Sequence, residues 1–264
     1  MRLFSRILGN GEPLLILHGL FGMSDNWLTI AKELAVEGFA VHLPDLRNHG
    51  KSPHTDTHRY TDMVDDLLDY LAVHGLDRCH IVGHSMGGKL AMIFSLLHPE
   101  HVTKLVVVDI APSDYRQSGD TFHHDLINTL LSINLREYNE RGSIRQLLEK
   151  RLGDKRLAAF FAKNIGRDEQ NGLVWKFNLP VLQRYLNHIR IGLHELEMYA
   201  PCPVSTLFIK GNDSEYYLPA HEPDRRFFFP NSVVQGIDNA GHWVHAEQTE
   251  IFLSILLRFL GQRQ

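Results

Sequence analysis

Ser85 is the residue whose surroundings most clearly suggest chemistry. Residues 79–88 read CHIVGHSMGG and contain the pattern G-x-S-x-G. A sharp turn from a strand into a helix can expose such a serine, and its glycines leave room for the backbone to fold close. The helix N-terminus would favour the negative charge that develops in acyl transfer. An ordinary tight turn is the alternative, so the pattern predicts a nucleophile only if the chain also supplies a base, an acid and an oxyanion hole.

His242 is the best candidate for the base. It follows the last expected strand in a Gly-His turn, late in the chain, as the order serine, acid, histidine requires. A base is needed because a serine hydroxyl is a weak nucleophile until its proton is removed. His245 fits a structural role better, and His84 should point away from the turn that exposes its neighbour.

Two aspartates could serve as the acid that orients this histidine, and we favour Asp109, with Asp213 as the alternative. Asp109 ends the strand after the nucleophile, where a rigid strand end can hold a carboxylate. Asp213 lies in a Gly-Asn-Asp-Ser turn, where it could equally be an Asx-turn or helix-capping residue. Asp238 is close to His242 in sequence, but we interpret it as a turn residue.

The oxyanion hole requires two backbone N–H groups aimed at the tetrahedral intermediate. The N–H of Met86, directly after the nucleophile, is one candidate. The N–H of Leu20, in the turn His18-Gly19-Leu20-Phe21-Gly22, is the other. Phe21 is a candidate for lining the substrate pocket, although packing in the core is an equally good interpretation.

The elements expected to position these residues alternate between strand and helix. Expected strands cover residues 14–17, 39–43, 79–83 and 102–108, with helices at 26–36, 60–73 and after Ser85. This order predicts an α/β fold with a mostly parallel central sheet and helices on both faces. The carboxyl ends of its strands would then meet at one edge, where ligands bind. Residues 2–8 are expected to form a hairpin with residues 14–17 across Gly9-Asn10-Gly11.

The pattern changes between residues 112 and 201, where helical periodicity replaces strands. Expected helices cover residues 121–132, 143–152, 155–164 and 179–198. We interpret this stretch as a helical cap inserted after the strand that ends at Asp109, with residues 1–111 and 202–264 forming the core. Packing at the side of the sheet is the alternative. Trp175 and Phe177 are candidate pocket residues of the cap. The alternation resumes with strands at 204–210 and 232–237 and helices at 218–228 and 249–260.

Composition excludes several classes of function. The chain of 264 residues has a net charge of -4, without the basic surplus of nucleic-acid-binding proteins. It contains no apolar run of about 20 residues, so no membrane span is expected. Its two cysteines do not make a disulfide framework, and its first residues lack the apolar core of a secretory signal, which favours a cytoplasmic location. None of its 17 histidines has metal-site spacing, so neither a metal nor a cofactor is expected.

Five stretches in order, HGLFG, PDLRNHGKS, GHSMGG, VDIAP and AGHWVHAE, resemble the α/β-hydrolase superfamily across essentially the whole chain. HGLFG, RNHG, GHSMGGK and DIAP look most like the small bacterial YbfF-type esterases, which also carry a helical cap. The resemblance implies a nucleophile at Ser85, a base at His242 and oxyanion donors at Leu20 and Met86. In the YbfF-type pattern the acid matches Asp109, whereas most of the superfamily places it near Asp213.

The resemblance and the residues together predict a cofactor-free serine hydrolase that cleaves a small-molecule ester or thioester with a small to medium acyl or aryl group. The alternative is a carbon–carbon bond hydrolase, a lyase or an acyltransferase that uses the same triad. A ligand receptor that keeps the fold without the chemistry is disfavoured by the intact set of Ser85, Asp109 and His242.

Overall fold

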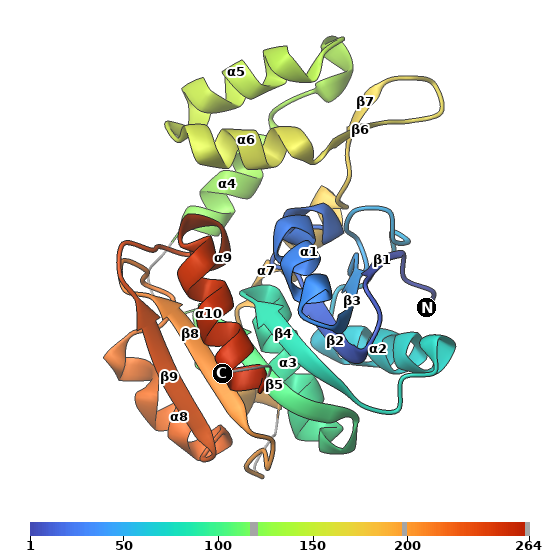
Figure 1. The fold of residues 1–264 in the computed structure, drawn as a ribbon. Helices are drawn as coiled ribbons and strands as arrows, with labels where there is room; N and C mark the ends of the chain where they lie inside the picture. Colours follow the sequence, from blue (N-terminus) through green and yellow to red (C-terminus); the bar gives the residue numbers. More distant parts are fainter. Residues whose placement is uncertain (117–120, 197–199, 262–264) are drawn as a thin grey trace.

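A seven-stranded sheet forms the centre of the computed structural model, which describes residues 1–116, 121–196 and 200–261 (Figure 1). Its strand order is β1-β3-β2-β4-β5-β8-β9, and every neighbouring pair is parallel except β1 and β3. The strands are β1 (Ser5–Leu8), β2 (Glu12–Leu17), β3 (Phe39–Pro44), β4 (Cys79–His84), β5 (Val102–Val108), β8 (Thr206–Gly211) and β9 (Ser232–Ile237).

Strands β2, β4 and β5 occupy the middle of the sheet because their apolar runs are buried on both faces. Every residue of β4 is buried, as are the last four residues of β2 and of β5. Strands that read as near-continuous apolar runs are typical of parallel sheets covered by helices on both sides. The predicted α/β class and mostly parallel sheet are confirmed.

Helices cover the two faces of this sheet. Apolar residues of α1 and α10 pack together against one face, and those of α2, α3 and α8 pack against the other. The helices outside residues 112–201 are η1 (Ser24–Trp27), α1 (Leu28–Val36), α2 (Tyr60–His74), α3 (Met86–Leu97), η2 (Pro99–His101), η5 (Pro219–His221), α8 (Glu222–Phe228), α9 (Val244–Glu247) and α10 (Thr249–Leu260).

The expected hairpin between the first two strands is wrong. Strand β1 pairs antiparallel with β3, with Ser5 opposite Pro44, and β3 lies between β1 and β2. The start of β3 packs closely against the Gly9–Gly11 turn, because a side chain at Gly9 would clash with the backbone oxygen of Phe39. A turn signal fixes the reversal of the chain but not which strand becomes the neighbour.

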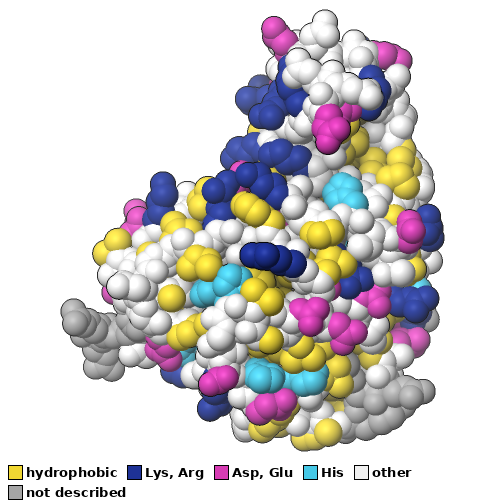
Figure 2. Space-filling model, turned by 90° about the vertical axis from the view of Figure 1, so that its right-hand side faces the viewer, with side chains coloured by type: hydrophobic (Ala, Val, Ile, Leu, Met, Phe, Trp, Pro, Cys, Tyr) yellow, Lys and Arg dark blue, Asp and Glu magenta, His cyan; other side chains and the backbone are white. Residues whose placement is uncertain are grey.

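Residues 112–201 are here called the inserted segment. Residues 122–175 of it project from one end of the sheet, whereas residues 179–189 lie close to the sheet (Figure 1). The inserted segment contains the expected helices and also a two-stranded antiparallel sheet that helical periodicity did not predict. Figure 2 shows Lys and Arg side chains gathered where this segment projects from the body. Its elements are α4 (Phe122–Leu131), η3 (Leu135–Glu137), α5 (Arg141–Leu152), α6 (Lys155–Lys163), β6 (Ile165–Arg167), β7 (Leu173–Trp175), α7 (Leu179–Ile189) and η4 (Leu193–Leu196).

The last helix of the inserted segment is shorter than the expected 179–198. Helix α7 ends at Ile189, and Gly192 precedes the short η4. At Gly192 the backbone approaches Asp114 so closely that an added side chain would clash with its N–H, which favours a break over continuation of the helix. Residues 197 and 198 lie outside the described part of the chain. In the described part, none of the helices has the length and apolar character that crossing a membrane requires.

Candidate active site

Ser85 lies in a strained turn between β4 and α3, as the G-x-S-x-G pattern predicts. Its backbone has φ 53° and ψ −120°, a conformation that non-glycine residues seldom adopt. The turn is so tight that a side chain at Gly83 would lie 2.3 Å from the backbone oxygen of Gly87. The Ser85 N–H donates to the carbonyl of Val108 at 3.0 Å, which ties the turn to β5. The hydroxyl therefore stands at the N-terminus of a twelve-residue helix.

Asp109 and His242 meet at the same edge of the sheet. An oxygen of the Asp109 carboxylate lies 2.7 Å from Nδ1 of His242, and the aspartate is 1% exposed. The other oxygen accepts a hydrogen bond of 3.0 Å from the N–H of Gly211, and the hydroxyl of Ser214 donates to the oxygen that faces His242. Burial with three hydrogen-bonding partners fixes this carboxylate in one orientation.

This contact determines which nitrogen of His242 can act as a base. A carboxylate accepts hydrogen bonds only, so Nδ1 carries the proton and donates it to Asp109. The other nitrogen, Nε2, is then an acceptor that can take the proton of a serine hydroxyl. The Asp109–His242 pair has the geometry of the acid and base in a serine–histidine–aspartate triad.

Two further residues hold the His242 ring from its other sides. The buried His84 donates from Nε2 to the backbone carbonyl of His242 at 2.8 Å. Burial, followed by the nearby His242, keeps the pKa of His84 well below its usual value, so this ring is neutral. The ring of Tyr216 stacks on that of His242 with centroids 3.9 Å apart and planes inclined by 26°. The expected hydrogen-bonding support from His84 is therefore present, although its side chain also borders the cavity at Ser85.

Asp213, the other candidate acid, does not approach the base. Its side chain is exposed, and its N–H donates to the carbonyl of Ala240 at 3.0 Å. The turn directs the next residue, Ser214, inward to Asp109 instead. Asp238 accepts a hydrogen bond from the Asn212 amide at 2.5 Å, as fits a turn residue. A one-residue difference in this turn therefore decides which side chain faces the sheet edge.

The turn that carries Leu20 lies directly against Ser85. A side chain added at Gly19 would come within 3.2 Å of Ser85 Cβ, so glycine favours this close approach. The turn continues through Phe21, at φ 61°, whose N–H donates to Nε2 of His49 at 3.1 Å. His49 in turn donates from Nδ1 to the carbonyl of Arg47 at 2.9 Å. Leu20 of this turn, Ser85 and Met86 border one small cavity, and the N–H of Met86 has no acceptor within α3.

We expect His49→Ala to lower kcat by between about 10- and 100-fold with little change in KM, because misplacement of a catalytic donor costs rate more than binding. His49→Gln, which can still accept from the Phe21 N–H, should recover much of the loss. The measurement is steady-state kinetics on a p-nitrophenyl ester. His54→Ala, an exposed position in the same loop, is the control. Full activity in His49→Ala would show that the turn holds its shape without this bond.

Several buried histidines are neutral in the folded protein and affect its stability. Burial is the main cause that lowers the pKa of His58 and of His245 to about 3. The ring of His245 stacks on that of Trp27, with the ring centroids 4.0 Å apart. In the unfolded chain both pKa values return to about 6.5, so below that pH the unfolded state binds more protons. The contribution of these two histidines to the free energy of unfolding is therefore present in full above about pH 6.5, and it is lost as the pH falls toward 3.

We expect the urea midpoint to decrease from pH 7.5 to pH 5, by up to about 1.4 kcal/mol of unfolding free energy per pH unit for each such histidine. The measurement is equilibrium unfolding followed by circular dichroism at several pH values. His245→Asn should make this dependence less steep. A midpoint that stays constant between pH 7.5 and 5 would contradict the assignment of neutral buried histidines.

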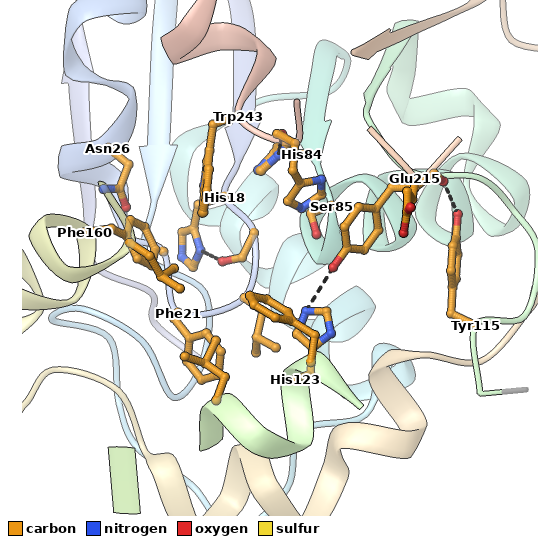
Figure 3. A pocket seen from close by; sticks show the side chains of 18 of the residues that line it. His18, Phe21, Asn26, His84, Ser85, Tyr115, His123, Phe160, Glu215 and Trp243 are labelled. Carbon is orange, nitrogen blue, oxygen red and sulfur yellow. Dashed lines mark hydrogen bonds between the residues drawn. The ribbon is translucent and has the colours of Figure 1, made fainter. Parts of the chain in front are cut away.

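A cavity of about 620 Å³, here called the larger cavity, opens beside Ser85 (Figure 3). Ser85 and His242 both line it, and aromatic side chains form much of the remaining wall, including Phe21, Phe160 and Trp243. A volume between about 300 and 1,000 Å³ is typical of small-molecule sites. The serine and the histidine are therefore brought together at a cavity large enough for a substrate.

Trp175 and Phe177 are not among the described residues that line this cavity. Phe177 is 2% exposed and packs behind the lining, with ring centroids 5.1 Å from Phe21 and 6.2 Å from Phe161. Trp175 stacks on Phe177 at 5.3 Å. Both side chains support the wall instead of facing the cavity, which corrects their expected position. The sequence identifies an aromatic residue but does not show whether other side chains will lie between it and a cavity in the fold.

Within the described residues, no group of histidine, cysteine, aspartate and glutamate side chains is arranged to hold a metal ion. The residues that sequence reasoning missed are those that surround the triad. Ser214 and Tyr216 follow β8 in an unremarkable loop, and His49 belongs to a motif with no evident partner. The only signal in the sequence that could have indicated them is that each follows the carboxyl end of an expected strand.

Comparison with known proteins agrees with this geometry. A family model described as alpha/beta hydrolase fold matches residues 12–249. The zebrafish (Danio rerio) protein named sn-1-specific diacylglycerol lipase ABHD11 is 36% identical over 96% of this chain and 79% of its own length. Esterase YbfF of Escherichia coli strain K12 is 32% identical over 96% of this chain and 94% of its own.

A solved structure described as a marine microorganism esterase is also similar. It aligns with a TM-score of 0.94 at 40% sequence identity, and the match covers 97% of this chain and 98% of that one. Similarity over nearly the full length of both chains includes the inserted segment as well as the sheet.

Proposed function

This chain belongs to the alpha/beta hydrolase family and is a serine hydrolase of the esterase/lipase type, and on that premise we propose that it cleaves carboxylic esters through an acyl-enzyme on Ser85. One observation carries the proposal. The buried carboxylate of Asp109 lies 2.7 Å from His242 Nδ1, at a cavity that Ser85 also lines. Thioesters are included, because the same attack on a carbonyl carbon cleaves both.

In the first half of the reaction, Ser85 Oγ attacks the carbonyl carbon while His242 Nε2 takes the hydroxyl proton. The N–H groups of Leu20 and Met86 stabilise the negative oxygen of the tetrahedral intermediate. The bond to the leaving oxygen or sulfur then breaks, and His242 gives its proton to the leaving group. The products of this half are a free alcohol or thiol and an acyl group bonded to Ser85.

In the second half, a water molecule gives a proton to His242 and attacks the acyl carbon. The bond to Ser85 Oγ breaks, the serine regains its proton, and the carboxylic acid leaves. Asp109 stays ionised throughout and stabilises the imidazolium that forms twice in each cycle. His242 carries every proton in this cycle, taking one from Ser85 in the first half and one from water in the second.

We propose that the inserted segment is a cap over the site. Phe160 of α6 and Leu126 of α4 line the larger cavity from this segment, which supports the cap over the alternative of packing at the side of the sheet. We also propose a cytoplasmic location, because Cys79 and Cys202 are both free thiols and such thiols are typical of a reducing compartment.

A serine-reactive phosphonate tests the proposed function. It should label the wild-type protein at one residue, identified as Ser85 by mass spectrometry, and the labelled protein should no longer hydrolyse p-nitrophenyl acetate. Prior incubation with EDTA should leave the rate unchanged. Labelling elsewhere, or hydrolysis that survives complete labelling, would contradict an acyl-enzyme on Ser85.

A further inference from the structure

A second, much smaller cavity of about 40 Å³ also reaches Ser85. Met86, Ile110, Leu186 and Ile189 contribute apolar surface to it. The residues that line both cavities include Leu20 and Ser85, so the two spaces meet at the predicted nucleophile and oxyanion turn. The hydroxyl of Tyr216 and Nε2 of His123, which also border both, lie 3.4 Å apart (Figure 3). The site is thus divided into two compartments of very unequal size.

The position of the base shows which part of an ester enters which compartment. His242 must reach the leaving oxygen to protonate it, and later the water that releases the acyl group. His242 lines the larger cavity and is not among the described residues that line the smaller one. The leaving alcohol therefore belongs in the larger cavity. The acyl chain, on the other side of the carbonyl carbon, belongs in the smaller one.

The volumes of the two cavities then limit the sizes of the acyl group and of the alcohol. One water-sized group needs roughly 10–15 Å³ measured in this way, so 40 Å³ holds about three such groups. The larger cavity, with its aromatic wall, holds a bulky apolar alcohol. Two cations also line the smaller cavity: Lys89 donates to the carbonyl of Ser113 at 2.7 Å, and Arg190 donates to that of Tyr115 at 2.6 Å.

We propose that the preferred substrates are esters of a short acyl group, from acetyl to about butanoyl, with a bulky apolar or aromatic alcohol. This inference rests on the proposed function and adds the substrate class. The wall that limits the acyl group comes from α7 of the inserted segment, through Leu186 and Ile189. The same segment contributes Phe160 to the alcohol side.

Two isomeric esters separate the compartments without a difference in composition. Benzyl acetate and methyl phenylacetate contain the same atoms, but the aromatic group is on the alcohol side in the first and on the acyl side in the second. We expect kcat/KM for benzyl acetate to exceed that for methyl phenylacetate by at least about tenfold. Along the series benzyl acetate, butanoate, hexanoate and octanoate, kcat/KM should fall after butanoate.

Leu186→Ala should widen the smaller cavity and move the preference toward benzyl hexanoate, by about tenfold relative to acetate. Leu182→Ala is the matched control, because Leu182 is buried one turn earlier in α7 and is not among the described residues that line either cavity. It should lose similar stability and keep the wild-type preference. An equal shift in both variants would overturn the assigned role of Leu186.

The outcomes distinguish this inference from the proposed function. Preference for methyl phenylacetate, or rates that rise up to benzyl octanoate, would overturn the assignment of compartments while hydrolysis through Ser85 stands. Failure to cleave any of these esters, together with no phosphonate label on Ser85, would overturn the proposed function itself.

Discussion

Replacing Ser85 by alanine is expected to lower kcat by on the order of 10⁶ while the protein stays folded. The substitution removes only the attacking hydroxyl, and the hydrogen bond from the N–H of residue 85 to the Val108 carbonyl remains. Residual hydrolysis would come from the oxyanion hole and binding alone. The measurement is the initial rate on p-nitrophenyl acetate, with thermal unfolding as the check on folding.

Ser95→Ala is the matched control for this experiment. Ser95 is a buried serine of the same helix, α3, and its hydroxyl donates to the carbonyl of Ala91 at 2.8 Å. This variant loses a hydroxyl but should keep nearly all activity. A Ser85→Ala protein that retained most of its rate would remove Ser85 from the mechanism.

Replacing Asp109 by asparagine is expected to lower kcat by about three to four orders of magnitude. The amide keeps the shape of the carboxylate but offers an N–H where an acceptor is needed. The His242 ring then takes the tautomer in which Nε2 carries the proton, so it cannot accept one from Ser85. The buried imidazolium that forms during the reaction also loses the negative charge that stabilises it.

Asp213→Asn is the control that separates the two candidate acids. Its carboxylate is exposed and lies in the neighbouring turn, so its loss should change kcat by far less than the loss at Asp109. The comparison uses kcat on one ester at pH values where both variants are folded. A loss at Asp213 as large as that expected at Asp109 would reverse the assignment of the acid.

The sequence predicts much of this site because each piece is a local signal at a strand end. The run of residues 79–84 predicts a buried strand, and the glycines around Ser85 predict the turn that follows it. The order of strands and helices then places His18, Ser85 and Asp109 at one edge without any knowledge of tertiary contacts. The oxyanion turn and the base could be found in the same way.

Other features depend on contacts between distant segments and could not be predicted. The neighbour of β1 is decided by β3, thirty or more residues later in the chain. The rigid strand end and the resemblance favour Asp109 over Asp213, but that Ser214 and not Asp213 points inward from the neighbouring turn is decided by packing. The expected pocket position of Trp175 fails because Phe177 and Phe21 lie on its inner side. In each case a local pattern is compatible with two arrangements, and packing selects one.

The wide spacing of the triad along the chain has a consequence for synthesis. Asp109 is 102 residues before Gly211, 105 before Ser214 and 133 before His242, the three residues that contact its carboxylate. Chains emerge from the ribosome in order, and their first-made segments begin to fold first. A nascent chain therefore displays Ser85 long before it has a base to activate it. On the proposed mechanism, hydrolysis needs the segment that follows β9, because that segment carries His242.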